Sequence, residues 1–407
     1  MRKPPVVVIG AGQAGMQICD SLRKSGYEGG LVLVGEEPAL PYQRPPLSKQ
    51  FLKGSLDPER LQFRPAEYYV KNAVDLRLDQ RVAAIDRQRR CVELADGDAI
   101  VYEKLALATG TRVRLLQCPG AGLDGVHYIR TVEDSRKLRD RLAASQRVAV
   151  IGGGFIGLEV AAIARALGKT VIVVEAMERL MARALSPIVS DFYAMLHRER
   201  GVELLLEQTV QSIRRDKGSL LIETGDGRTL EADIIVAGIG VVPNVELAEE
   251  CGLECRNGIV VDSRAGTRDP NIVAAGDCTM HHNGFLEREI RLESVQNAVD
   301  QAKIAAATLC GEDKTYHQVP WFWSDQYDIK LQMAGVGSSY DEHVVRGEIG
   351  IDGFSVFYYR NGRLIAADSI NRPADHMACR KLLAKGKSLT LDEAGDLEFN
   401  LVQAAKA

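Results

Sequence analysis

Four residues in the middle of the chain have the types and the spacing needed to bind a dinucleotide. Gly152, Gly154 and Gly157 form a glycine-rich turn, and Glu175 follows about 20 residues later. The first glycine permits a tight turn, the second leaves space for a pyrophosphate, and the third lets a helix pack closely on a strand. A carboxylate at the position of Glu175 can accept hydrogen bonds from both hydroxyls of a ribose. The pattern therefore predicts a nucleotide site.

The same pattern occurs near the beginning of the chain. Gly10, Gly12 and Gly15 have the same spacing, and Glu36 or Glu37 stands at the ribose position. One glycine fingerprint can arise in a turn that binds nothing, but two complete copies in one chain are much harder to explain by chance. The sequence therefore predicts two dinucleotide sites.

Both glycine sets require a strand before them and a helix after them. The apolar runs VVVIG at 6–10 and VAVI at 148–151 predict these strands. One predicted helix runs through Leu22 to an end near Gly26, and the other has an apolar face that includes Ile156 and Leu167. A helix that begins at the glycines presents free N–H groups and its positive dipole end to the phosphates.

Three further strands are predicted to end in residues that let the backbone approach a ligand. The strand at 104–108 ends in Thr109 and Gly110, the strand at 233–237 is followed by GIG with Gly240 as its last residue, and the strand at 272–275 is followed by Gly276 and Asp277. The last of these strands comes after the second glycine set. We therefore expect the chain to return there and complete its first sheet.

These elements predict an α/β protein with two Rossmann-like dinucleotide-binding domains, the second inserted in the first, and a C-terminal α+β domain. The predicted first domain comprises residues 1–116 and 244–317, the second 117–243, and the third 318–407. The segment 117–125, rich in glycine, and Pro243 with Asn244 mark the linkers. Alternating strands with a hairpin turn at Asn361 and Gly362, followed by a helix at 374–384, indicate the third domain.

The composition excludes several classes of function. Lys and Arg number 51 and Asp and Glu 55, a net charge of −4, so no strong field attracts nucleic acid or an anionic membrane. The sequence has no signal peptide and no apolar run of about 18 residues, so we expect a cytoplasmic protein without a membrane-spanning helix. The 8 cysteines include no CxxC motif and no zinc-type spacing with histidine. We expect no metal site and reduced thiols.

At this point the sequence resembles a known family, the FAD-dependent pyridine nucleotide-disulfide oxidoreductases, and within it the NADH-dependent ferredoxin reductases that serve oxygenases, of the putidaredoxin-reductase and biphenyl-dioxygenase-reductase types. The resemblance covers nearly the whole chain. It rests on GAGQAG at 10–15, PYQRPPLSK at 41–49, LALATG at 105–110, YIRTVEDS at 128–135, GGGFIGLEVA at 152–161, AGIGVVPN at 237–244, AAGDC at 274–278, ESVQNAVDQ at 293–301 and FWSDQYDIKLQ at 322–332.

The resemblance implies that the first domain binds FAD and the second NADH. Besides the first glycine set and the strand end at Thr109 and Gly110, it implies FAD contacts for Ala14, Glu36, Arg44, Lys49, Val82, Arg130, Asp277 and Val295. For NADH it implies contacts with Gly152, Gly154, Ile156, Gly157, Glu175 and Gly240. Glu159 is implied to lie near the nicotinamide, paired with Lys49, and Trp323 beside the flavin ring. These three are the candidate catalytic residues, although core packing is an equal explanation for Trp321 and Trp323 from the residues alone.

The charge of Glu175 favours NADH over NADPH. Its carboxylate would repel a 2′-phosphate and would accept from the free hydroxyls of NADH. Arg183, which we count among the coenzyme-binding residues, and Arg179 follow closely and could tolerate a phosphate. The preference is therefore predicted, while its strictness stays open.

The way in which electrons leave the flavin distinguishes members of the family. Disulfide reductases and peroxide-reducing relatives have a cysteine after the first ribose strand, but the segment PALPYQRPPLSKQFLKG at 38–54 has none. Electrons are therefore predicted to pass directly, one at a time, to a [2Fe-2S] ferredoxin that supplies a cytochrome P450 or a ring-hydroxylating dioxygenase. Arg288, Arg291 and Lys330 could steer an acidic ferredoxin, with a solvated surface as the equal alternative.

Two other functions are compatible with these residues. The first is an NADH oxidase or an NADH:quinone reductase, although the terminus DLEFNLVQAAKA is a poor membrane-binding tail. The second is a flavin-binding signalling protein, resembling apoptosis-inducing factor, in which reduction changes conformation or oligomeric state. The sequence is compatible with a monomer or a homodimer.

Overall fold

Each glycine set directly follows a short apolar strand in the middle of a parallel sheet. This computed structural model describes residues 3–406, so residues 1–2 and 407, the outermost residues of the predicted first and third domains, lie outside it. The described chain forms two compact units. Unit 1 contains the chain up to Gln43, Pro58–Arg112 and Val242–Pro320, and unit 2 contains Arg44–Asp57, Val113–Val241 and the chain from Trp321 onward.

The main sheet of unit 1 is parallel, with the strand order β19-β7-β1-β2-β3. Its strands, in chain order, are β1 (Val6–Ile9), β2 (Leu31–Val34), β3 (Val74–Arg77), β7 (Lys104–Leu107) and β19 (Ile272–Ala274). Strands β1 and β2 are buried throughout, as expected for a sheet covered on both faces. The pairing of β19 with β7 confirms that the chain returns to its first sheet.

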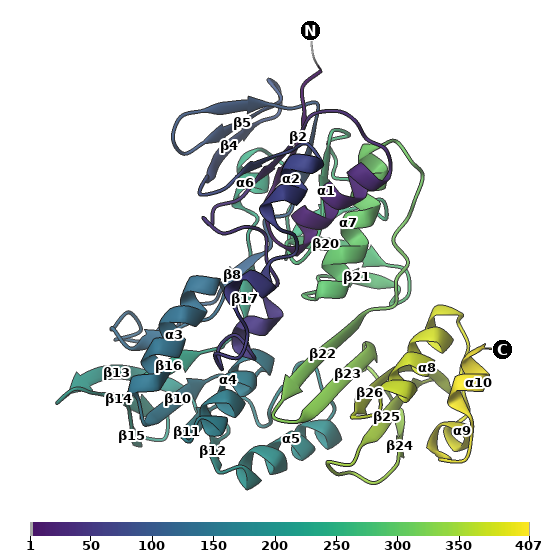
Figure 1. Cartoon of the computed structure of the whole chain (residues 1–407). Coiled ribbons are helices and arrows are strands. Elements are labelled where there is room, and N and C mark those ends of the chain that lie inside the picture. The colour runs from purple at the N-terminus through teal and green to yellow at the C-terminus, as the bar shows by residue number, and fades with distance from the viewer. Residues whose placement is uncertain (1–2, 407) are drawn as a thin grey trace. The chain divides into compact units, whose positions relative to one another are not determined.

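Helices α1 (Gln13–Lys24) and α7 (Val295–Leu309) pack side by side against one face of this sheet (Figure 1). Ile18 and Leu22 of α1 and Ala302 and Ala305 of α7 are buried in one cluster with Leu33 of the sheet. The remaining elements of unit 1 are η2 (Pro58–Leu61), α2 (Ala66–Lys71), β4 (Val82–Asp86), β5 (Cys91–Leu94), β6 (Ala99–Val101), α6 (Glu246–Glu250), β18 (Ile259–Val261), β20 (Thr279–Asn283) and β21 (Arg288–Ile290).

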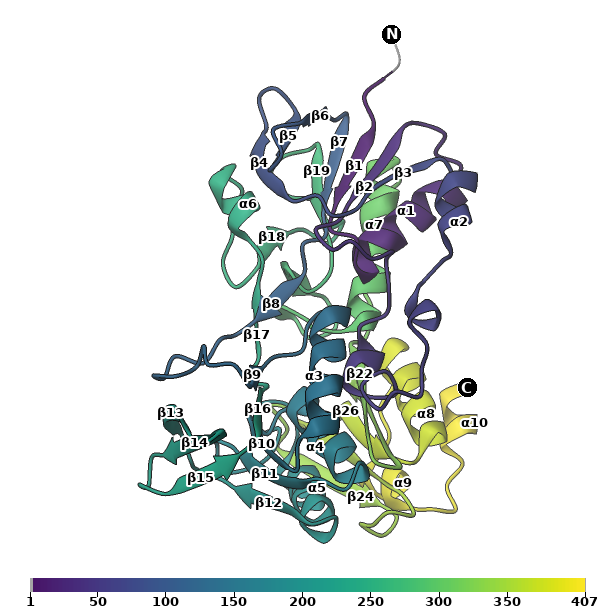
Figure 2. The same cartoon turned by 60° about the vertical axis from the view of Figure 1, so that its left-hand side comes forward.

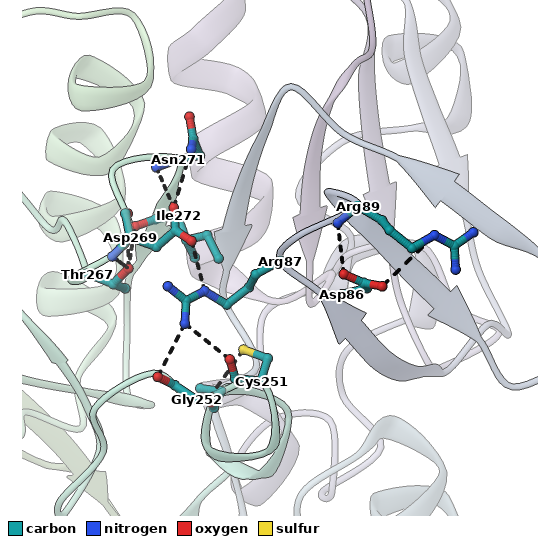
Figure 3. Close-up of polar contacts among 10 residues, drawn as sticks. Asp86, Arg87, Arg89, Cys251, Gly252, Thr267, Asp269, Asn271 and Ile272 are labelled. Atoms are coloured by element: carbon teal, nitrogen blue, oxygen red, sulfur yellow. Dashed lines mark hydrogen bonds and ion pairs between the residues drawn. The ribbon is translucent and has the colours of Figure 1, made fainter.

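The antiparallel strands β4, β5 and β6 cover the other face of the sheet, where Val82, Val92 and Leu94 join its second buried cluster (Figure 2). Figure 3 shows how Arg87, which follows β4, is tied to the segment ahead of β19. The Arg87 Nε donates to Asp269 Oδ2 over 2.8 Å, and Nη1 donates to the carbonyls of Cys251 and Gly252, which directly follow α6. The sheet of β4, β5 and β6 is thereby fixed to the rest of unit 1 by polar contacts as well as by apolar packing.

Unit 2 repeats the parallel sheet, with the strand order β12-β11-β10-β16-β9. These strands are β9 (Val126–His127), β10 (Arg147–Ile151), β11 (Thr170–Val174), β12 (Val202–Leu205) and β16 (Ile234–Ala237), and the helices are η1 (Pro45–Ser48), α3 (Val132–Ala144), α4 (Phe155–Ala166) and α5 (Pro187–Glu199). A three-stranded antiparallel sheet follows α5 and β12, comprising β13 (Val210–Asp216), β14 (Ser219–Thr224) and β15 (Thr229–Ala232). Helix α3 begins with a capping box, because Thr131 Oγ1 accepts from Asp134 N–H and the Asp134 carboxylate accepts from Thr131 N–H.

The last part of unit 2 is an antiparallel sheet with the order β22-β23-β26-β25-β24, followed by three helices. Its elements are β22 (Trp321–Gln326), β23 (Ile329–Gly335), β24 (Glu342–Arg346), β25 (Phe354–Arg360), β26 (Arg363–Ile370), α8 (Pro373–Ala384), α9 (Leu391–Gly395) and α10 (Leu401–Lys406). Strands β8 (Thr111–Val113) and β17 (Val241–Pro243) form a two-stranded sheet of their own. The predicted fold class is confirmed, while the predicted limits of the three domains stay a proposal.

Candidate functional site

The first glycine set forms a turn at the end of β1, which is the candidate phosphate cradle. Gly10 has φ +106°, and a Cβ there would lie 2.1 Å from the carbonyl oxygen of Ala108. A Cβ at Gly15 would lie 1.8 Å from the carbonyl oxygen of Gly10, so both positions need glycine for packing. At Gly12, in contrast, a Cβ would meet nothing within 4 Å. Gly12 is also the N-cap of α1, and no side chain caps it, so the helix N–H groups border open space that fits a pyrophosphate.

The second glycine set has the same construction at the end of β10. Gly152 has φ +105°, and a Cβ at Gly157 would lie 2.1 Å from the carbonyl oxygen of Gly152. Gly154 is the uncapped N-cap of α4, and a Cβ there would meet only the Gly238 carbonyl oxygen, at 3.8 Å. In the first turn of α4, the Ile156 side chain is 42% exposed. An exposed apolar side chain beside an open cradle suits contact with a coenzyme.

The structure brings Glu175 to the second glycine turn and holds Arg179 by hydrogen bonds to its own segment. The Glu175 carboxylate accepts from Gly153 N–H over 2.5 Å and from Met177 N–H over 2.7 Å. The Arg179 guanidinium donates to the carbonyls of Ala182 and Leu185 and to Ser190 Oγ. It therefore has little freedom to turn toward a 2′-phosphate.

Arg183 and Gly240, the other two residues predicted at the coenzyme, lie together. Gly240 has φ +102°, and a Cβ there would lie 3.4 Å from Nη2 of the exposed Arg183. Glycine at this position leaves room for the arginine beside the end of β16.

In unit 1 the predicted FAD residues Gly10, Glu36, Thr109 and Asp277 follow the carboxyl ends of β1, β2, β7 and β19. Gly276, directly before Asp277, has φ +92°, and a Cβ there would lie 3.1 Å from the Ala14 Cβ. The strand end at Thr109 and Gly110 is held by Asn244, whose side chain donates to Thr109 O and whose N–H donates to Gly110 O. Ligands of open parallel sheets bind at these carboxyl ends.

Four predicted FAD residues differ in their surroundings. Glu36 is exposed at the end of β2, while the neighbouring Glu37 accepts from the Tyr42 hydroxyl over 2.5 Å. Val82 is buried at the start of β4, and Val295 is the first residue of α7. The acidic ribose contact remains a choice between Glu36 and Glu37.

The buried carboxylate of Glu159 is the centre of the candidate catalytic site. Glu159 lies on α4 and is 4% exposed. Its Oε1 is 2.8 Å from Lys49 Nζ, which confirms the expected pairing, and it also accepts from Ser324 Oγ over 2.7 Å. Its Oε2 accepts from Ser48 Oγ over 2.5 Å. A buried carboxylate is costly unless it is paired and hydrogen-bonded, and these three donors meet that requirement.

Sequence reasoning did not identify Ser48 or Ser324. Ser48 is adjacent to Lys49 in η1, so the adjacency was an available signal, but Ser324 is 165 residues from Glu159 and lies on β22. Only the pairing of elements from three parts of the chain brings these hydroxyls to the carboxylate.

Arg44, Arg130 and Trp323 also belong to unit 2. Arg44 Nη1 donates to the Arg130 carbonyl over 2.5 Å, so these two predicted FAD residues lie together. The half-buried Trp323 ring lies 5.5 Å from the ring of Trp321, and the Arg380 guanidinium lies 4.4 Å from the Trp321 ring centre. The predicted contacts of Arg44, Lys49, Arg130 and Trp323 with FAD stay a proposal.

The cysteines are free thiols in the structure. Burial raises the pKa of the Cys278 thiol, which directly follows Asp277, so this thiol stays protonated at neutral pH. Within residues 3–406, His, Cys, Asp and Glu side chains form no group of three or more that could hold a metal ion. None of the described helices combines the length and the apolar character needed to cross a membrane.

Comparison with known proteins gives matches along nearly the whole chain. The family model described as pyridine nucleotide-disulphide oxidoreductase matches residues 4–302, and the model described as reductase C-terminal matches residues 321–405. The chain is 49% identical to rhodocoxin reductase of Rhodococcus erythropolis over 397 residues, which cover 97% of this chain and 93% of the relative.

Two solved structures are similar over their full length. The ferredoxin reductase for the CYP199A2 system from Rhodopseudomonas palustris has a TM-score of 0.97 and 44% identity, with 99% of this chain and 100% of that chain covered. Putidaredoxin reductase, in its covalent complex with putidaredoxin, has a TM-score of 0.96 and 39% identity, with 100% of both chains covered.

Proposed function

The chain belongs to the pyridine nucleotide-disulphide oxidoreductase family, and from this premise we propose that it oxidises NADH and passes the electrons through bound FAD, one at a time, to a [2Fe-2S] ferredoxin. The enzyme is thus a ferredoxin reductase, an assignment that its full-length likeness to such reductases supports. The observation that carries the choice of acceptor is the segment 38–54, which contains no cysteine where a dithiol relay would need one.

FAD supplies the hydride-accepting and single-electron chemistry when it is bound, and the protein supplies binding and orientation. The open N-terminus of α1 at Gly12 holds the FAD pyrophosphate, and that of α4 at Gly154 holds the pyrophosphate of NADH. Glu175 binds the ribose hydroxyls and selects against a 2′-phosphate. Because Arg179 is engaged by Ala182, Leu185 and Ser190, it cannot offset this repulsion, and the enzyme is predicted to prefer NADH.

Lys49 and Glu159 serve the reaction as a pair. The Lys49 ammonium and the hydroxyls of Ser48 and Ser324 keep the Glu159 carboxylate in one position. A fixed carboxylate favours one orientation of a neighbouring nicotinamide, and orientation is the main help that a hydride transfer needs from a protein. Trp323 is proposed to cover the flavin ring.

An acidic ferredoxin requires a basic surface, and the three residues predicted for steering differ in their availability. Arg288 in unit 1 and Lys330 in unit 2 are exposed. Arg291 is only 11% exposed and is paired with Glu293 over 2.6 Å. Arg288 and Lys330 are therefore the better candidates for steering the partner.

We further propose that the ferredoxin supplies a cytochrome P450 or a ring-hydroxylating oxygenase, and that the enzyme works in the cytoplasm as a monomer or a homodimer. The likeness to a reductase that serves the CYP199A2 system supports the first of these proposals.

Rapid mixing tests the proposed function. The holoenzyme is reduced with NADH under anaerobic conditions and mixed with an oxidised [2Fe-2S] ferredoxin from a P450 system, while flavin absorbance is followed, and NADPH is used in a parallel reduction. We expect the oxidised ferredoxin to reoxidise the flavin rapidly after mixing. A flavin that stays reduced until oxygen or a quinone is added would instead identify an oxidase or quinone reductase. Very slow reduction by NADH, with a long-lived reduced state, would favour a signalling protein.

A further inference from the structure

A line of fully buried polar side chains leads away from Glu159 through unit 2. Ser324 Oγ lies 2.7 Å from Glu159 Oε1, and Gln326 Nε2 lies 3.4 Å from Ser324 Oγ. Gln326 Oε1 then lies 2.9 Å from His197 Nε2, and His197 Nδ1 lies 3.1 Å from the Tyr327 hydroxyl. Ser324, Gln326 and His197 each have an exposed fraction of 0%. The line therefore connects the carboxylate on α4 to α5 through two residues of β22.

The carboxylate determines the direction of every hydrogen bond in this line. An ionised carboxylate only accepts, so the Ser324 hydroxyl must donate to Glu159. The lone pairs of Ser324 are then left for the Gln326 amide nitrogen, which also donates to Met181 Sδ over 3.8 Å, so the Gln326 carbonyl faces His197. His197 must therefore carry its proton on Nε2, and its Nδ1 accepts from the Tyr327 hydroxyl.

The environment of His197 keeps its ring neutral. Burial lowers the pKa of His197 to about 4, although the hydrogen bond from its ring to Gln326 acts in the opposite direction. At pH 7 the ring thus has one N–H, as the line requires. Tyr327, the outer residue of the line, is half-buried and has φ +57°. The Arg200 guanidinium lies 5.3 Å from the centre of its ring.

We infer that His197 and Gln326 are positioning residues, which orient the Ser324 hydroxyl and thereby hold the Glu159 carboxylate in the place that hydride transfer from NADH requires. This inference rests on the proposed function, because that function gives Glu159 its role. Neither residue touches the carboxylate, and both act through Ser324.

Packing alone does not explain why these buried residues are polar. Apolar side chains of similar volume would fill the same space without the need for hydrogen-bond partners, and buried polar networks are often no more stable than such replacements. Each group in the line has a partner, and the inner end of the line is a carboxylate that receives two more donors. A fully satisfied network of this kind specifies one arrangement of its members.

Histidine tautomers give a test that does not depend on activity. The chain has 7 histidines, so the holoenzyme can be labelled with ¹⁵N-histidine, and the His197 signals are assigned by their loss in His197→Gln. We expect the neutral Nε2–H tautomer at pH 7. Ser324→Ala removes the nearer of the two acceptors that orient Gln326, so a second tautomer should become detectable at His197, two links away.

Ser145→Ala is the matched control for the tautomer experiment. Ser145 is also a buried serine of unit 2, but its hydroxyl donates to the Arg141 carbonyl and has no contact with the line. Its substitution should leave the His197 signals unchanged. An Nδ1–H tautomer in the wild-type protein, or a His197 ring that does not respond to Ser324→Ala, would overturn the inference.

Anaerobic reduction by NADH, followed by stopped flow without any ferredoxin, tests the positioning itself. His197→Leu removes the donor to Gln326 and should slow flavin reduction about tenfold, because a small displacement of a positioned group is costly to hydride transfer. His197→Gln keeps an N–H donor at nearly the same place and should stay within about twofold of wild type. Tyr359→Phe is the control for lost stability, since it removes a buried hydroxyl that donates only to the Thr390 carbonyl.

The outcomes separate this inference from the proposed function. A His197→Leu enzyme that is reduced as fast as wild type would contradict the positioning role, whichever acceptor the enzyme uses. If His197→Leu does not fold, Gln326→Leu takes its place, because it breaks the link between His197 and Ser324 and leaves the Ser324 hydroxyl in place to donate to Glu159. Normal reduction kinetics with no transfer to ferredoxin would contradict only the choice of acceptor.

Discussion

Gly154→Ala should weaken NADH binding while leaving the fold almost unchanged. Gly154 has φ −83° and ψ 177°, which alanine adopts without strain, and the nearest atom to the added Cβ would be 3.8 Å away. Replacing glycine by alanine stabilises a compatible site by about 0.4–1 kcal/mol through the unfolded state. Alanine is a poorer N-cap than glycine by a similar amount, about 0.5–1 kcal/mol. The two effects offset each other, so stability should change by less than about 1 kcal/mol.

The loss of binding follows from the position of the new methyl group. It would occupy the open space in front of the α4 N-terminus, where the pyrophosphate must approach the backbone N–H groups. Hydrogen bonds to a charged group contribute about 1.5–3 kcal/mol each. Weakening one of them raises the dissociation constant for NADH about 10- to 100-fold. Binding of FAD should not change, because its cradle begins at Gly12 in unit 1.

Stopped-flow reduction at a series of NADH concentrations gives the apparent dissociation constant, and thermal unfolding gives the stability. Two control variants bracket the result. Gly157→Ala places a Cβ 2.1 Å from the Gly152 carbonyl oxygen and should destabilise the fold by about 3 kcal/mol. Gly168→Ala has a positive φ and no neighbour within 4 Å, so it should lower stability by about 1 kcal/mol without an effect on NADH. Unchanged NADH affinity in Gly154→Ala would refute the cradle as the pyrophosphate site.

Three further predictions concern unit 2. Glu175→Ala should raise the dissociation constant for NADH about tenfold by removing the ribose contact, yet stopped-flow titration should not show tight NADPH binding, because Arg179 stays engaged with its three acceptors. Arg346→Met removes the donors to the carbonyls of Ala394, Leu397 and Phe399, and urea unfolding should show a loss of about 2–4 kcal/mol with early proteolysis after α9. Burial raises the pKa of Asp368 to about 7, despite the hydrogen bond from Tyr358. The folded state therefore keeps a proton on Asp368 that the unfolded state releases near pH 4. For this reason the free energy of unfolding of the wild type should fall as pH rises from about 4 to 7, and that of Asp368→Asn should not show this fall. An equal pH dependence in wild type and variant would contradict the raised pKa.

The fold and the two cradles were predictable because each depends on residues close together in the sequence. Gly10, Gly12 and Gly15 serve one turn between one strand and one helix, so their spacing alone contains the geometry. The return of the chain at β19 was predictable from a buried strand that ends in Gly276 and Asp277. The strands β20 and β21 were not predicted, because polar runs such as TMHHN at 279–283 do not show the alternation typical of strands, even though His281 and Asn283 are buried.

The surroundings of Glu159 could be predicted only in part, because they are assembled from three distant segments. The pairing with Lys49 came from family resemblance, whereas the hydroxyls of Ser48 and Ser324 and the line through Gln326 and His197 depend on packing between elements. Serine and glutamine in a strand are ordinary residues, and no spacing distinguishes these from others. The surroundings of Arg179 were likewise not predictable. Its charge suggested tolerance of a phosphate, whereas in the structure its guanidinium donates to three acceptors.

Helix α4 connects coenzyme binding to the candidate catalytic carboxylate through a fixed distance. Gly154 caps the helix and Glu159 follows five residues later, so the two lie about 7.5 Å apart along the helix axis. A rigid helix that holds the pyrophosphate at its first turn must place the carboxylate at the same separation in every turnover. The orientation of the carboxylate is a different matter, because side-chain torsions are not set by the helix. Lys49, Ser48 and Ser324 supply that orientation from η1 and β22, so the distance is a property of one helix and the direction is a property of the surrounding network.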